Sequence, residues 1–146
     1  MTKIIPNYEE DFYGWVVANS ILLKQRKFNE ADMENIIEEI ESMGRSEENQ
    51  LTRRFSIILM HLLKWHYQPT LQCKSWKVTL REQRRASRRL INRNPSLKAK
   101  MDNYLFDAYE DAVDEAIKET GLDEKMFPSS CPYTLEKIMN DEFYPE

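Results

Sequence analysis

Apolar residues recur at helical spacing along most of the chain, and this pattern predicts a protein built from α-helices. A first apolar stripe lies within residues 9–27, and a second one covers residues 33–43. We expect Gly44 to end or kink the second helix. Residues 46–67 carry apolar side chains on more than one side of the predicted helix, so this segment is expected to be the central, most buried one.

Three further helices are predicted in the second half of the chain. One covers residues 76–92, before the Asn94-Pro95 pair, and another covers residues 96–120, with Gly121 as its left-handed C-cap. A short helix is expected near residues 134–139. The prediction is therefore an all-α, up-and-down helical bundle of about five main helices plus a short C-terminal helix.

Length and composition narrow the class of protein. With 146 residues, we expect a single domain over residues 1–146, and only 3 glycines argue against a turn-rich β-sandwich or a glycine-rich phosphate loop. We expect no secretory leader, because the sequence does not open on a basic, apolar and small-residue pattern, and no apolar run is long enough to cross a membrane. Cys73 and Cys131 lack metal-type spacing, which favours a cytoplasmic protein. We expect no cofactor.

The charge is strongly segregated along the chain. Residues 1–50 carry 5 basic and 11 acidic side chains (−6), residues 51–100 carry 13 and 1 (+12), and residues 101–146 carry 3 and 13 (−10). These sum to the net charge of −4. A basic middle segment between two acidic flanks is therefore the dominant electrostatic feature.

The basic segment is concentrated in one predicted helix. Its charged face is formed by Lys77, Arg81, Arg84, Arg85 and Arg88, joined by Arg89 and Arg93. Arginine is favoured where phosphate or carboxylate groups are bound, so this face is our candidate for binding a protein or nucleic-acid partner. The alternative is internal pairing with the acidic faces formed by Glu34, Glu38 and Glu41 and by Asp107, Asp111 and Asp114. The thin apolar edge of this helix also suits a homodimer interface.

Several blocks of the sequence resemble one family. They include YEEDFYGW (residues 8–15), NIIEEIESMGRSE (residues 35–47) and LMHLLKWHYQP (residues 59–69), in an order that covers nearly the whole chain. This resembles the bacterial family called domain of unknown function 29. The resemblance implies a small all-α bacterial protein and brings no reaction and no catalytic residues with it.

A weaker pattern suggests chemistry. Arg54 and His61 are seven residues apart, nearly in line on one helix, and their spacing resembles the loose arginine–histidine motif of the nucleotide-binding ribonucleases of higher eukaryotes and prokaryotes. In a metal-independent RNA-cleaving bundle, the histidine would move a proton and the arginine would steady phosphate charge. The competing interpretation is a core histidine bonded to a neighbouring backbone group or carboxylate.

No metal site is predicted. A di-metal site in a bundle requires Glu-x-x-His on two helices, and the positions three residues before His61 and His66 are Ile58 and Leu63. The sequence alone therefore favours a non-enzymatic interaction module and leaves the RNA-cleaving or RNA-binding bundle as the alternative.

Overall fold

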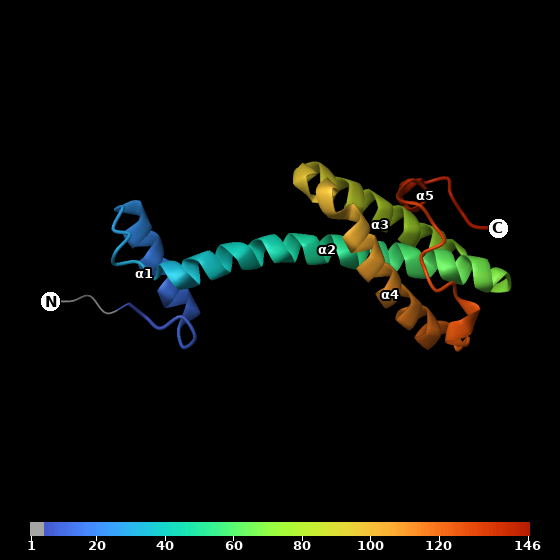
Figure 1. The fold of residues 1–146 in the computed structure, drawn as a ribbon, viewed down its shortest axis with the longest axis horizontal. Helices are drawn as coiled ribbons and strands as arrows, with labels where there is room; N and C mark the ends of the chain where they lie inside the picture. Colours follow the sequence, from blue (N-terminus) through green and yellow to red (C-terminus); the bar gives the residue numbers. More distant parts are fainter. Residues whose placement is uncertain (1–4) are drawn as a thin grey trace. The chain divides into compact units, whose positions relative to one another are not determined.

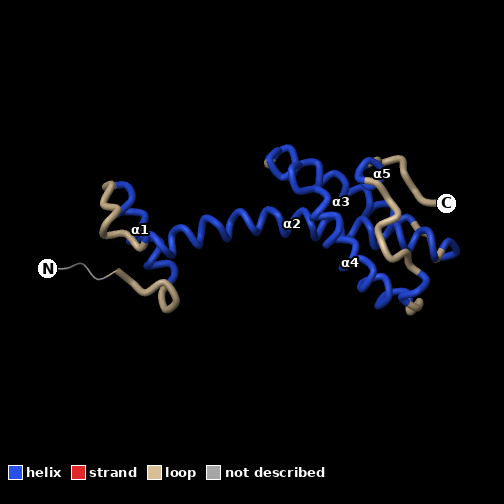
Figure 2. The backbone as a smooth tube through the Cα atoms, in the orientation of Figure 1, coloured by secondary structure: helices blue, strands red, loops and turns tan. Residues whose placement is uncertain are grey.

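The computed structural model describes residues 5–146, which form helices and loops with no strand in that range (Figure 2). The α-helices are α1 (Phe12–Lys24), α2 (Met33–Tyr67), α3 (Lys74–Arg93), α4 (Met101–Thr120) and α5 (Leu135–Met139). Short 3-10 helices cover Pro69–Leu71, Pro95–Lys100 and Glu124–Met126. The predicted all-α class is confirmed. None of the helices within residues 5–146 combines the length and apolar character needed to cross a bilayer.

The chain divides into two compact units, an N-terminal unit that ends at Arg45 and a C-terminal unit, Ser46–Glu146. Helix α2 contributes its first part to the N-terminal unit and its second part to the C-terminal unit. The single domain over residues 1–146 stays a prediction.

The N-terminal unit is a pair of helices held at one end by polar contacts. Asp11 caps α1 by accepting a hydrogen bond from the Gly14 amide at 3.0 Å. Trp15 and Asn19 are the buried residues of α1. The Trp15 indole donates to Asp32 at 2.9 Å, and the Asp32 amide donates to the Asn19 side chain at 2.8 Å. Hydrogen bonds from Asn35 and Trp15 lower the pKa of Asp32. These contacts fix the loop between α1 and α2.

The C-terminal unit contains the main hydrophobic core. Helix α3 returns along the second part of α2, α4 crosses that part of α2, and α5 lies against α3 (Figure 1). The fully buried side chains of α2 in this core are Leu51, Phe55, Ile58, Leu59, Leu62 and Leu63. On α4, the alanines at every fourth position, Ala108, Ala112 and Ala116, are also fully buried. Small side chains at this spacing let a neighbouring helix approach closely.

Several predicted helix boundaries are corrected by the structure. The break at Gly44 is wrong, because α2 continues through that residue as one helix from Met33 to Tyr67. A methyl group at Gly44 would meet no atom within 4 Å, so the glycine serves no close approach. Residues 95–100 are 3-10 rather than α-helical. The predicted C-cap at Gly121 is confirmed by its φ of 72°.

We expect Gly44→Ala to stabilise the protein and Gly121→Ala to destabilise it. Alanine at position 44 adds helix propensity without a clash, and should raise the free energy of unfolding by about 0.5–1 kcal/mol. Alanine at position 121 is forced into the left-handed region, which should cost about 1 kcal/mol. Urea denaturation followed by circular dichroism measures both. Destabilisation by Gly44→Ala would contradict a continuous α2.

Candidate partner interface on helix α3

Helix α3 has one apolar face and one strongly basic face. Leu80, Ser87 and Leu90 are buried against the rest of the C-terminal unit. The helix carries eight basic residues against a single acid, Glu82. Its C-terminus is closed by Asn94, whose side-chain amide donates to the Leu90 carbonyl at 3.0 Å. Some of these basic side chains are bound by other parts of the protein, and others are exposed without an ion-pair partner.

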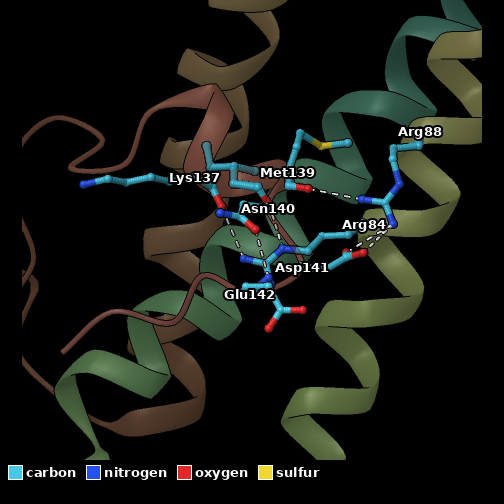
Figure 3. A network of polar contacts seen from close by, with 8 residues as sticks. Arg84, Arg88, Lys137, Met139, Asn140, Asp141 and Glu142 are labelled. Carbon is cyan, nitrogen blue, oxygen red and sulfur yellow. Dashed lines mark hydrogen bonds and ion pairs between the residues drawn. The ribbon is translucent and has the colours of Figure 1, made fainter.

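Arg84 belongs to the interior. Its side chain is only 1% exposed, and its guanidinium donates to the Lys137 carbonyl at 3.4 Å (Figure 3). It also donates to the backbone carbonyls of Ile138 at 2.8 Å and Phe143 at 3.0 Å. Two of these carbonyls lie in the last turn of α5, where a helix lacks donors for its final carbonyls. The Lys137 carbonyl there also accepts a hydrogen bond from the Asn140 amide at 3.2 Å. Burial lowers the pKa of Arg84, yet an arginine stays charged at neutral pH. Arg84 thus holds the C-terminal segment on α3.

Arg88 supports the same segment from the edge. It donates to the Met139 carbonyl at 3.1 Å and forms an ion pair with Asp141 at 3.0 Å (Figure 3). The side chains of Arg88 and Asp141 are 40% and 49% exposed, so their Coulomb attraction is strongly screened. The hydrogen bond to the backbone is the more specific part of this contact.

Two other basic residues of α3 have partners within the C-terminal unit. Arg93 forms an ion pair with Glu47 at 2.7 Å, and hydrogen bonding from Arg93 is the main reason that the pKa of Glu47 is lowered. The ammonium group of Lys77 lies 5.7 Å from the ring centre of Trp65 and 5.8 Å from that of Tyr144. These distances are within the range of a cation–π interaction.

Arg81, Arg85 and Arg89 are exposed and form no ion pair within residues 5–146. We call these three residues the arginine stripe. Spaced by four residues, they follow one another at intervals of about 6 Å along the solvent face of α3. Of the predicted binding set, Lys77, Arg81 and Arg85 therefore lie on exposed surface. Arg84 and Arg88 hold the C-terminal segment instead, and partner binding stays a prediction.

The predicted internal pairing with the acidic helices takes a different form. Glu38 and Glu41 lie within 4 Å of Arg45 on their own helix, at 2.7 and 3.8 Å. Helix α4 carries seven acidic residues against one basic residue, but in the described chain none of its acids forms an ion pair with α3. The C-terminal unit therefore has one exposed basic helix and one acidic helix that do not neutralise each other through ion pairs.

Arg54 and His61 each have a partner within the protein. Arg54 donates to the Gln83 side chain at 3.2 Å. His61 is 9% exposed, and its Nδ1 atom lies 2.9 Å from the Ile57 carbonyl of the preceding turn. Burial lowers the pKa of His61, so its ring is neutral near pH 7. A role for the two residues in RNA cleavage stays a prediction.

Among residues 5–146, no three potential ligands of the His, Cys, Asp and Glu types gather closely enough to hold a metal ion.

The sequence contained one signal for the interior role of Arg84. Arg84 follows Leu80 by four residues and precedes Ser87 by three, which places it on the buried face of α3. The carbonyl acceptors more than 50 residues later could not be found by spacing, because they belong to the backbone of the C-terminal segment.

These features define an all-α protein with a basic surface helix in its C-terminal unit. Residues 7–144 match the family model described as "Domain of unknown function DUF29", and the chain belongs to this family. No curated protein and no solved structure matches the chain in the same comparisons.

We expect Arg84→Met to destabilise the C-terminal unit by about 2–4 kcal/mol, because it removes the guanidinium donor from the buried carbonyls of Ile138 and Phe143. The Lys137 carbonyl keeps its hydrogen bond from the Asn140 amide. Arg85→Met, at the neighbouring exposed position, is the matched control and should leave the unfolding midpoint unchanged. Urea denaturation measures both variants. Equal stability of Arg84→Met and the parent protein would show that the C-terminal segment is held by other contacts.

We expect His61 to make stability fall as the pH is lowered. Its pKa is depressed in the folded state, so between that value and about 6.5 the unfolded chain binds more protons than the native one, and the free energy of unfolding decreases as the pH falls. Urea midpoints measured from pH 7.5 to pH 5 should show a shallower slope for His61→Gln. An unchanged slope in His61→Gln would refute the effect.

Proposed function

We propose that this protein is a non-enzymatic interaction module whose arginine stripe binds an acidic surface of a partner protein. One observation carries the proposal: Arg81, Arg85 and Arg89 are exposed, regularly spaced and without an ion-pair partner, whereas the other arginines of α3 are held by the protein itself. Guanidinium groups at this spacing match carboxylates presented on a partner helix.

The charge of the rest of the protein supports a protein partner over a nucleic acid. The net charge is −4, and α4 places seven acidic residues in the same unit as the stripe. A long polyanion would meet this acidic surface as well as the stripe, while a protein partner can confine its acidic residues to the contact. Three free arginines also supply few of the phosphate contacts that nucleic-acid affinity depends on.

We expect the stripe to bind an acidic helical peptide with glutamates at every fourth position. Replacing Arg81, Arg85 and Arg89 by glutamine should weaken binding about tenfold or more at low salt, equivalent to at least about 1.4 kcal/mol, and added salt should weaken the parental complex. Fluorescence anisotropy of the labelled peptide measures both effects. The matched control replaces three exposed lysines elsewhere, Lys98, Lys118 and Lys125, and removes the same amount of charge.

The same titration with a labelled single-stranded RNA in EDTA tests the alternative. Salt-sensitive RNA binding that is lost with the arginine stripe, in the absence of peptide binding, would replace the acidic protein by a nucleic acid. RNA cleavage that disappears in His61→Ala would favour the RNA-cleaving bundle and overturn a non-enzymatic role. Equal peptide binding by the stripe variant and the lysine control would refute the proposed interface.

A further inference from the structure

The N-terminal unit exposes an unusual amount of apolar surface for its size. Nine large hydrophobic side chains of this unit are more than one-third exposed: Phe12, Tyr13, Val17, Ile21, Phe28, Met33, Ile37, Ile40 and Met43. The most exposed of them, Tyr13, is 79% accessible. Single exposed apolar residues are common on protein surfaces, but a contiguous group marks a contact surface.

Helix α1 is apolar around most of its circumference. Its sequence, FYGWVVANSILLK, has one charged residue, and the side facing away from Trp15 still carries Tyr13, Val17 and Ile21 at successive turns. A helix that is apolar on all sides is normally surrounded by other elements. Within the N-terminal unit, however, only Trp15 and Asn19 of α1 are buried.

Helices α1 and α2 enclose a groove within the N-terminal unit, and three of the exposed side chains, Phe12, Ile40 and Met43, line it. This α1–α2 groove has a volume of about 340 Å³, and its apolar lining comes from Phe12, Val16 and Leu23 of α1 and Ile36, Ile40 and Met43 of α2. Glu39 is the only charged residue that lines it, and the Tyr8 hydroxyl donates a hydrogen bond to its carboxylate. The groove can therefore accept apolar side chains at the cost of burying little charge.

The two ends of α1 carry opposite charges. Glu9, Glu10 and Asp11 precede or begin the helix, and Lys24, Arg26 and Lys27 end or follow it. All six are exposed, and none forms an ion pair in the described part of the chain. An antiparallel copy of α1 would place its basic end opposite the acidic end of the first copy, at both ends of the contact.

We infer that the N-terminal unit is a homodimerisation element, in which the α1 helices of two copies pack antiparallel about a two-fold axis and fill each other's α1–α2 groove. A two-fold contact uses the same surface on both copies, so that surface must be complementary to itself. The apolar centre of α1 and its oppositely charged ends meet this requirement.

The available apolar area is sufficient for a stable dimer. With about 150–200 Å² for a large side chain, the exposed fractions of the nine residues leave roughly 700–950 Å². One partner in an interface of standard size contributes about 800 Å², of which a little over half is apolar. The N-terminal unit can therefore supply the apolar share even if some of these residues stay outside the contact.

The size of the N-terminal unit gives a second reason for a permanent partner. Units of about 40 residues bury too little surface to be stable unless oligomerisation, a metal or disulfides support them. Cys73 and Cys131, the only two cysteines, both lie outside this unit.

The charge of the N-terminal unit argues against a lipid surface as the partner. The polar face of α2 in this unit carries Glu34, Glu38 and Glu41, which would be repelled by an anionic lipid surface. A second copy of the chain would cover the exposed apolar side chains and would place opposite charges against the two ends of α1.

Sedimentation velocity on the full chain tests this inference. We expect a dimer of twice 17.5 kDa at micromolar concentration, and a shift to monomer in Val17→Asp and Ile40→Asp. Phe106→Asp is the matched control, because Phe106 is 66% exposed on α4 and should not affect the dimer. Circular dichroism verifies that each variant remains folded. A monomeric parent protein, or a dimer that persists in both folded variants, Val17→Asp on the exposed face of α1 and Ile40→Asp in the groove, would overturn the inference.

A charge-inversion experiment keeps the test independent of apolar packing. Lys24→Glu with Lys27→Glu makes both ends of α1 acidic, and Glu9→Lys with Glu10→Lys makes both ends basic, so each chain alone should dimerise at least about tenfold more weakly. Mixing the two chains should restore association as a heterodimer. Failure of the mixture to associate, or unchanged dimerisation of each chain alone, would refute pairing through α1. The inference does not depend on the arginine stripe, which can be lost without affecting the dimer.

Discussion

The buried guanidinium of Arg84 is the interaction on which the C-terminal unit depends. A charge in the interior is costly unless its donors are satisfied, and here the acceptors are carbonyls of Lys137, Ile138 and Phe143 rather than a carboxylate. A helix as short as α5 has little stability of its own. Arg84 donates to the Ile138 carbonyl in its last turn and is a second donor to the Lys137 carbonyl. One side chain thus satisfies the end of α5 and fixes the path of the segment that covers α3.

This arrangement divides the basic residues of α3 by function. The residues that face inward or toward the C-terminal segment are bound to the protein, and the arginine stripe is what remains for a partner. The N-terminal unit has a different character, because nine of its large hydrophobic side chains are exposed. We therefore regard the protein as carrying two interaction surfaces of different chemistry, one proposed for an acidic partner and one for a second copy of the chain.

The sequence predicted the helical fold well because apolar spacing is a local property. The apolar positions of residues 46–67 correctly indicated the most buried helix. The break expected at Gly44 was wrong because a single glycine weakens a helix only slightly when the residues on both sides favour it. The interior role of Arg84 and the hydrogen bond from Arg54 to Gln83 were not predicted, because both depend on partners brought together by packing.

The distance along the chain between Arg84 and its acceptors has a consequence for synthesis. The carbonyl of Ile138 is 54 residues away in sequence, so α3 is complete well before its interior arginine has anything to bind. At elongation rates of about 5–20 residues per second, this delay lasts for several seconds. During that interval the nascent chain presents an amphipathic helix with an unmatched charge on its apolar face. We expect such a chain to be a substrate for ribosome-associated chaperones until the last acceptors emerge.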